Sequence, residues 1–306
     1  MRKRGYKAEL AFGATAAGGT LGILIPPSIP MIVYGTITEN SIGRLFAAGI
    51  VPGILLTIFF SLGILAHVLY SPALAPYEKV SSSWAKKFRS VQGIWPVLLL
   101  IAAVLGSIYG GIATPSEAAG LGCVIAVLLA IFYYHKLDMK NLKIACLNTA
   151  RTTAMVGMII AGAMVFGYLM SALKVPSSII NLISSSEISR WYVIIGINLV
   201  LLFLGCFLEA ISIIVITAPT IVPIIVALGF DPIWFGIVMT INMELALITP
   251  PVGLNLFIIG GIVPDAHMMT IIRGVLPFII LAMIFLGIVI AFPELSLWLP
   301  RLFYGK

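Results

Sequence analysis

Charged residues are scarce in this chain, and their scarcity excludes a soluble protein. Only 9% of the 306 residues are Asp, Glu, Lys or Arg, whereas 61% are hydrophobic. Soluble domains carry about 25% charged residues. The apolar runs also lack the alternation of polar and apolar residues that marks the strands of outer-membrane barrels. The composition, with a mean hydropathy of +1.15, therefore predicts an all-α polytopic membrane protein.

Patterns for metal, nucleotide and covalent chemistry are lacking too. The cysteines Cys123, Cys146 and Cys206 have no metal-ligand spacing, and they lie in or beside apolar segments, which predicts packing residues. The chain has no phosphate-binding loop and no catalytic triad. The net charge of +7 sits in a few loops, as the positive-inside rule expects. We therefore expect no cofactor, no ATP use, no nucleic-acid partner and no enzymatic activity.

What the chain does contain is a pair of consecutive prolines inside an apolar run. The stretch GGTLGILIPPS occupies residues 18–28, where a membrane-spanning helix would be expected. Consecutive prolines remove backbone donors and clash with the preceding turn, so one continuous helix is excluded. The freed backbone groups cannot face lipid and must lie in protein or beside a polar cavity. The run predicts either a broken helix at a binding site or a proline kink without a ligand.

The same pattern returns near the other end of the chain. Residues 245–255 read LALITPPVGLN, and the offset between the two Pro-Pro pairs also separates Gly5-Tyr6 from Gly229-Phe230. Broken helices at corresponding places of two halves are the best sequence indication of a secondary transporter's binding site. Because the first span is predicted to run outward and the second inward, we expect an inverted repeat.

Loop charges predict how the spans are divided and oriented. Basic residues in 1–7, 79–89 and 135–151 place these segments in the cytoplasm, and 84–89 is expected along the membrane surface. We predict three parts: residues 1–43 as the end of repeat 1 with the first broken helix; residues 44–151 as scaffold helices with an interfacial arm at 135–151; and residues 152–306 as repeat 2, with the broken helix at 232–257 and the last span at 273–293.

Residues 190–228 are apolar but interrupted around Glu209. They fit either two complete spans or a re-entrant hairpin whose tip stops near the middle of the membrane. No Lys or Arg occurs between Arg190 and Arg273, which favours the hairpin, because a cytoplasmic turn usually carries a basic residue. The second half also has about 75 residues of span and hairpin before the position that matches Gly5. We therefore expect that an N-terminal piece of repeat 1 is missing from this sequence.

Three acidic residues lie within the predicted membrane segments, where acids are costly and usually functional. Glu117 falls in the first turn of its predicted helix, and a capping role explains it. Glu209 lies at the candidate hairpin tip, where it could orient loop amides or approach an ion. Glu244 lies two turns before Pro251 and could bond freed N–H groups or contact a ligand.

The breaks supply two candidate sites. Unwound carbonyls are hard ligands suited to Na⁺, and the positive N-terminal ends of the half-helices favour an anionic substrate. The candidate Na⁺ ligands are Gly19, Thr20, Ile25, Ser212, Thr217, Ala246, Ile248 and Thr249. The candidate substrate contacts are Pro27, Ser28, Pro251, Gly253 and Asn255.

Four stretches of this chain together resemble the large membrane subunit of tripartite ATP-independent periplasmic (TRAP) transporters. They are GGTLGILIPPS at 18–28, GIATPSEAA at 111–119, GFDPIWFG at 229–236 and ITPPVGLNLF at 248–257. The resemblance covers essentially the whole chain. It implies an elevator-type secondary transporter of the bacterial inner membrane, driven by a Na⁺ gradient and importing C4-dicarboxylates, sialic acids or related carboxylates. It also implies a periplasmic binding protein, a small four-helix membrane subunit and two facing hairpins, of which this sequence lacks the first.

Three other functions remain open on the sequence. The chain could be a related ion-coupled carboxylate carrier without a binding protein, or a non-transporting fragment that only assembles with a partner. It could also be a membrane-embedded enzyme using Glu209 or Glu244, although the paired His or Asp motifs of such enzymes are lacking. A binding-protein gene beside this one would favour the TRAP transporter over the carrier.

Overall fold

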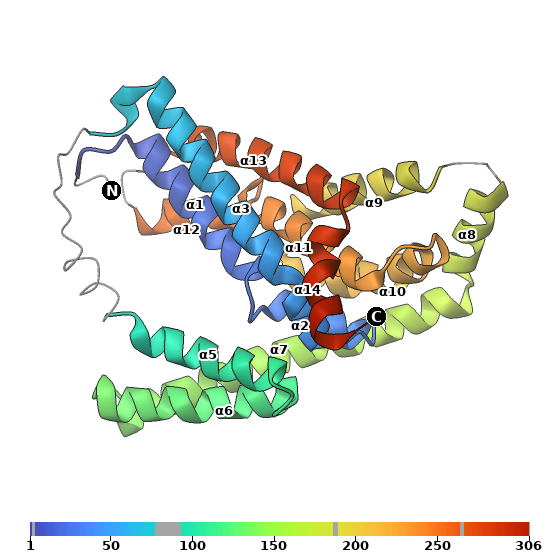
Figure 1. Cartoon of the computed structure of the whole chain (residues 1–306), viewed down its shortest axis with the longest axis horizontal. Helices are drawn as coiled ribbons and strands as arrows, with labels where there is room; N and C mark the ends of the chain where they lie inside the picture. The colour runs from blue at the N-terminus through green and yellow to red at the C-terminus, as the bar shows by residue number, and fades with distance from the viewer. Residues whose placement is uncertain (2–3, 77–92, 186–188, 264–265, 306) are drawn as a thin grey trace. The chain divides into compact units, whose positions relative to one another are not determined.

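The computed structural model describes residues 1, 4–76, 93–185, 189–263 and 266–305, and the described part is helical (Figure 1). The predicted basic loop at 79–89, including the surface segment 84–89, lies outside the described residues. The elements in chain order are α1 (Ala8–Leu24), α2 (Ile29–Ile37), α3 (Ile42–Tyr70), η2 (Pro72–Leu74), α5 (Trp95–Tyr109), α6 (Pro115–Leu128), η3 (Leu129–Tyr133), α7 (Met139–Ala172), α8 (Val175–Ser185), α9 (Arg190–Gly205), α10 (Ala210–Ala227), α11 (Pro232–Ile248), α12 (Leu254–Ile262), α13 (Met268–Ala291) and α14 (Glu294–Tyr304).

Several of these helices have the length and composition of membrane spans. Among the described residues, six helical stretches are long and apolar enough to cross a bilayer, whose hydrocarbon core is about 30 Å thick. They are 8–37, 42–70, 115–133, 139–172, 210–227 and 268–291. The prediction of an all-α, multi-pass membrane protein is therefore confirmed.

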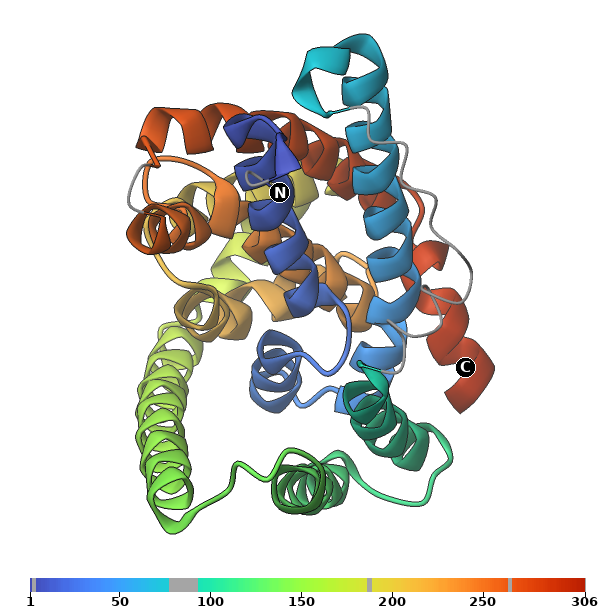
Figure 2. The same cartoon turned by 90° about the vertical axis from the view of Figure 1, so that its left-hand side faces the viewer.

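The chain divides into two compact units. Residues 1–76 and 160–306 form one, and residues 77–159 form the other. Within the first unit, α1, α3 and α13 lie side by side (Figures 1 and 2), and α11 packs against all three of them. Within the second unit, α5 packs against α6. The assignment of 44–151 to a scaffold and of the flanking parts to moving repeats stays a prediction.

Glycines allow α1 and α13 to approach closely. A Cβ built on Gly13 would overlap the backbone carbonyl of Gly274, and one built on Gly274 would overlap the carbonyl of Glu9. Helices in membranes often associate through close backbone contact at small residues. Burial of apolar side chains contributes little to this association, because lipid tails are equally apolar. This contact fixes α1, and with it the first break, against the C-terminal part of the chain.

One helix is longer than expected, and one prediction about packing is wrong. α7 runs as one helix over Met139–Ala172, across the boundary between the predicted interfacial arm at 135–151 and the part that begins at residue 152. The segment contains no proline, which allows a continuous helix, and the interfacial position of the arm stays a prediction. The packing role expected for cysteines fails at Cys123 and Cys146, which are exposed, whereas Cys206 is half-buried.

Candidate functional site

The first predicted break is present between α1 and α2. The N–H of Ile25 bonds to the carbonyl oxygen of Leu21, and helical geometry then ends before Pro26. Ser28, which is 1% exposed, caps α2 by accepting a hydrogen bond from the Met31 N–H at 3.5 Å. Extended backbone therefore joins two short helices within one apolar stretch.

The second break lies between α11 and α12. Thr249 ends α11, and its N–H reaches the Ala246 carbonyl oxygen only at 3.4 Å. Gly253 begins the next helix at a φ of +21°, and a side chain there would crowd the carbonyl oxygen of Thr249. Both Pro-Pro bonds, at 26–27 and 250–251, are cis. The two halves thus contain matching interruptions, as the repeat predicted.

The structure brings the two interrupted helices together. The Asn255 side-chain amide donates a hydrogen bond to the Ala16 carbonyl oxygen at 3.3 Å, across to α1. A Cβ built on Gly19 would lie 3.6 Å from the same amide nitrogen. Two of the predicted site residues, Gly19 and Asn255, therefore face each other although they come from opposite ends of the chain.

Glu244 is the most unusual polar residue near the breaks. It is 1% exposed, and both of its carboxyl oxygens lack a hydrogen-bond partner among the described residues. The side chain of Thr20, also 1% exposed, lies beside the carboxyl group. Among the described residues, Glu244 therefore does not bond the N–H groups freed by the break, and its role in contacting a ligand stays a prediction.

Most of the hydroxyl groups predicted to bind Na⁺ bond to their own helix. Thr20, Thr217 and Thr249 donate to the carbonyl oxygens of Ala17, Ile213 and Leu245 at 2.8, 2.7 and 2.6 Å. Ser212 instead donates to Glu209 at 3.2 Å. Hydroxyls that donate in this way keep lone pairs free to accept, so their oxygens still suit a hard cation. Of these four residues, only Thr20 lies beside the unpartnered carboxyl group.

A buried amide pair near the site escaped the sequence interpretation. The side-chain amide of Asn242 donates a hydrogen bond to the side-chain oxygen of Asn198 at 2.5 Å, and this bond joins α11 to α9. Asn242 is 0% exposed, and its own carbonyl oxygen has no partner among the described residues. The spacing of Asn242 and Glu244 places them on different sides of α11. The first polar side chain therefore fixes α9, while the second faces α1.

Glu117 has the local role that its position indicated. The Thr114 hydroxyl caps α6, and the Glu117 carboxylate accepts hydrogen bonds from the N–H and hydroxyl of Thr114, both at 2.8 Å. Reciprocal bonding of this kind is a capping box. Capping of the N-terminal end of α6 is enough to explain Glu117.

Several oxygen atoms of the kinds that bind hard cations lie near the two breaks. They include the unpartnered carboxylate of Glu244, the hydroxyl of Thr20, and the backbone carbonyls at the ends of α1 and α11 that no longer have helical partners. Carboxylate, hydroxyl and carbonyl oxygens are the donors that hard cations prefer. A multi-pass helical protein in which two broken helices meet at buried polar groups has the architecture of a secondary transporter.

Comparison with known proteins gives the family. Residues 1–295 match the family model of the DctM component of tripartite ATP-independent periplasmic transporters. A C4-dicarboxylate TRAP transporter large permease protein of Pseudomonas aeruginosa is 40% identical over 98% of this chain and 70% of its own length. Large permease proteins of Vibrio cholerae named for C4-dicarboxylates and for sialic acid are 36% and 32% identical, over 100% of this chain and 71% and 70% of their own lengths.

The chain therefore belongs to the family of large permease subunits of TRAP transporters. The relatives are permease subunits rather than enzymes. The match agrees with the resemblance seen in the Pro-Pro stretches, and it covers both broken helices.

Proposed function

We propose that this chain is the permease subunit of a Na⁺-coupled TRAP transporter that imports a small organic acid. The observation that carries the proposal is the meeting of the two broken helices at Glu244 and Thr20. An unpaired carboxylate buried among apolar side chains is very costly, and a bound cation removes most of that cost. We take Na⁺ as that cation, held by Glu244, Thr20 and the freed carbonyls.

The substrate is proposed to be a C4-dicarboxylate or a related carboxylate. The relatives at 40% and 36% identity are named for C4-dicarboxylates, and others are named for sialic acid and ectoine. The N-terminal ends of α2 and α12, which follow the two breaks, offer positive partial charge to a carboxylate. The residues proposed to contact it are Pro27, Ser28, Pro251, Gly253 and Asn255.

Transport is proposed to proceed by an elevator movement with α9 and α10 as a re-entrant hairpin. α9 has 16 residues, or about 24 Å of helix, which is shorter than the roughly 30 Å hydrocarbon core. Its last residue, Gly205, packs against Ala246, three residues before the break in α11. Both features favour a hairpin tip that stops at the depth of the break over two complete spans.

Two protein partners complete the proposal. A small four-helix membrane subunit would brace this chain in the bacterial inner membrane, and a periplasmic binding protein would deliver the substrate. The support is the tripartite, periplasmic description of the matching family.

Uptake in proteoliposomes tests the proposal. The complete reading frame that contains this chain would be reconstituted with its small subunit and binding protein, and uptake of labelled succinate, fumarate and sialic acid would be measured. We expect uptake of one of these acids only with an inward Na⁺ gradient and only with the binding protein. If uptake is the same with and without the binding protein, the chain is a carrier that needs no binding protein. If uptake is the same in a K⁺ gradient as in a Na⁺ gradient, transport is not coupled to Na⁺.

A further inference from the structure

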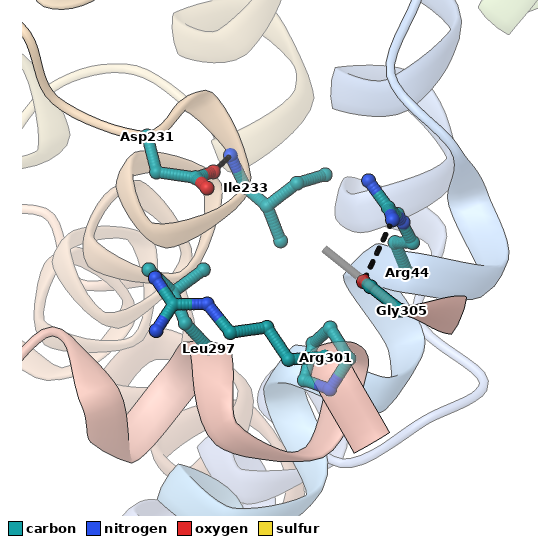
Figure 3. Close-up of a pocket in the computed structure, with 7 residues that line it drawn as sticks. Arg44, Asp231, Ile233, Leu297, Arg301 and Gly305 are labelled. Carbon is teal, nitrogen blue, oxygen red and sulfur yellow. Dashed lines mark hydrogen bonds between the residues drawn. The ribbon is translucent and has the colours of Figure 1, made fainter. Parts of the chain in front are cut away.

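A charged pocket lies apart from the two breaks, where α3, α14 and the N-terminal end of α11 meet. It has a volume of about 440 Å³, and its charged lining residues are Arg44, Asp231 and Arg301 (Figure 3). In the view of Figure 3, Arg44 lies on the right and Asp231 on the upper left beside Ile233. Arg301 extends leftward below them, so its guanidinium group lies below Asp231 on the side away from Arg44. Two guanidinium groups and one carboxylate therefore share one hollow.

The pocket lies at the ends of membrane helices. Arg44 is in the first turn of α3, and Asp231 is the N-cap residue of α11. Arg301 is on α14, which begins three residues after α13 ends at Ala291. Because long apolar helices begin or end here, the pocket lies at the boundary between hydrocarbon and water, where phospholipid headgroups are found.

The charges in the pocket remain available to a ligand. Arg44 donates to the carbonyl oxygens of Gly305 and Tyr304 at 3.1 and 3.5 Å, and its guanidinium lies 6.0 Å from the centre of the Tyr304 ring. It has no ion pair among the described residues. Arg301 pairs with Glu294 at 2.6 Å, but the two side chains are 48% and 67% exposed, and exposed pairs are weak. Asp231 accepts a hydrogen bond from the Ile233 N–H at 2.7 Å through one of its two carboxylate oxygens.

α14 also carries large apolar side chains that are exposed. Leu297 and Pro300 line the pocket, while Trp298 and Leu302 on the same helix are 57% and 65% exposed. A short helix with one packed face, exposed large apolar side chains and a basic residue is typical of a helix lying in the membrane interface, and tryptophan is enriched there. Acyl chains can cover this exposed surface.

We propose that the pocket binds the headgroup of a zwitterionic phospholipid with a primary ammonium group, of the phosphatidylethanolamine type. The phosphate lies between Arg44 and Arg301, and the ammonium group donates to Asp231. Guanidinium groups match phosphate oxygens in geometry and charge. The two signs of charge in the pocket select a headgroup that also carries both signs. The proposal is independent of the transported substrate and of Na⁺ coupling.

Lipid retention measured by native mass spectrometry tests this site. The purified protein would be delipidated and incubated with equal amounts of phosphatidylethanolamine, phosphatidylcholine and phosphatidylglycerol of the same acyl chains. We expect phosphatidylethanolamine to be retained at least threefold over phosphatidylcholine, whose quaternary ammonium cannot donate a hydrogen bond, and over phosphatidylglycerol, which lacks the ammonium group.

Variants separate the two contacts. Arg44→Gln and Arg301→Gln should each reduce phosphatidylethanolamine retention severalfold. Asp231→Asn should keep the helix cap, since Asn also caps well, and should lose the preference over phosphatidylglycerol. Arg273→Gln is the matched control, because Arg273 is an exposed arginine near the other end of α13, and it should leave lipid retention unchanged.

Equal retention of the three lipids by the wild type would overturn the proposal. The proposal would also be overturned if Arg44→Gln and Arg301→Gln retained lipid normally but no longer bound the periplasmic protein. That result would assign the pocket to an acidic protein partner.

Discussion

Replacing Glu244 by glutamine is expected to weaken Na⁺ binding at least tenfold. The amide keeps the shape of the buried side chain but removes the carboxylate oxygen that is proposed as the charged ligand of Na⁺. A tenfold loss of affinity corresponds to about 1.4 kcal/mol, and loss of a charged ligand in a buried site can exceed that value.

The melting temperature of the purified protein measures this effect. A ligand that binds only the folded state raises stability with its concentration, so the wild type should melt at a higher temperature in NaCl than in KCl at equal ionic strength. Glu244→Gln should lose most of this difference, and in KCl it should melt close to the wild-type temperature, because the amide has nearly the same shape as the carboxyl group. Glu294→Gln, which changes an exposed acid, is the control. A normal Na⁺ effect in Glu244→Gln would exclude Glu244 from the ion site.

Adding a single methyl group at Gly205 is expected to impair transport strongly. A Cβ at this position would overlap the Cβ of Ala246, so α9 must separate from α11 beside the break. Overpacking of this kind typically costs about 1–3 kcal/mol. If α9 ends at the tip of a re-entrant hairpin, the displacement falls on the part that closes over the substrate, and Gly205→Ala should reduce uptake more than tenfold.

A control and a rescue distinguish this contact from general damage to α9. Gly196→Ala changes a glycine on the same helix that has nothing within 4 Å, and it should leave uptake unchanged. The double variant Gly205→Ala with Ala246→Gly removes the overlapping methyl group and should recover much of the activity, since contacting residues couple in a double-mutant cycle. Full activity in Gly205→Ala alone would show that the hairpin tip does not pack at the break.

The sequence predicted the features that depend on local backbone chemistry. Proline cannot donate and clashes with the preceding turn, so the breaks at 25–28 and 249–253 could be placed before any packing was known. The Thr114–Glu117 capping box is likewise a short-range pattern with a known geometry. Both required only the order of neighbouring residues.

Features that depend on packing between distant segments could not be placed in this way. Three such features depend on how two helices are rotated relative to each other, which the sequence alone does not give. They are the environment of the Glu244 side chain, the Asn198–Asn242 hydrogen bond and the contact of Gly205 with Ala246. The charged pocket needs three elements from far apart in the chain. The paired asparagines are the one signal that could have been noticed, since amides inside apolar helices usually require a partner.

Cross-linking of the two breaks tests the central claim most directly, namely that the interrupted helices of the two halves close on one shared site. Gly19 and Asn255 would be changed to cysteine in an otherwise cysteine-free protein and oxidised mildly in membranes. Because a Cβ at Gly19 lies 3.6 Å from the Asn255 amide, this pair should form a disulfide, whereas Gly18→Cys with Asn255→Cys should not, since Gly18 has nothing within 4 Å. Equal cross-linking of both pairs, or none of either, would contradict the account.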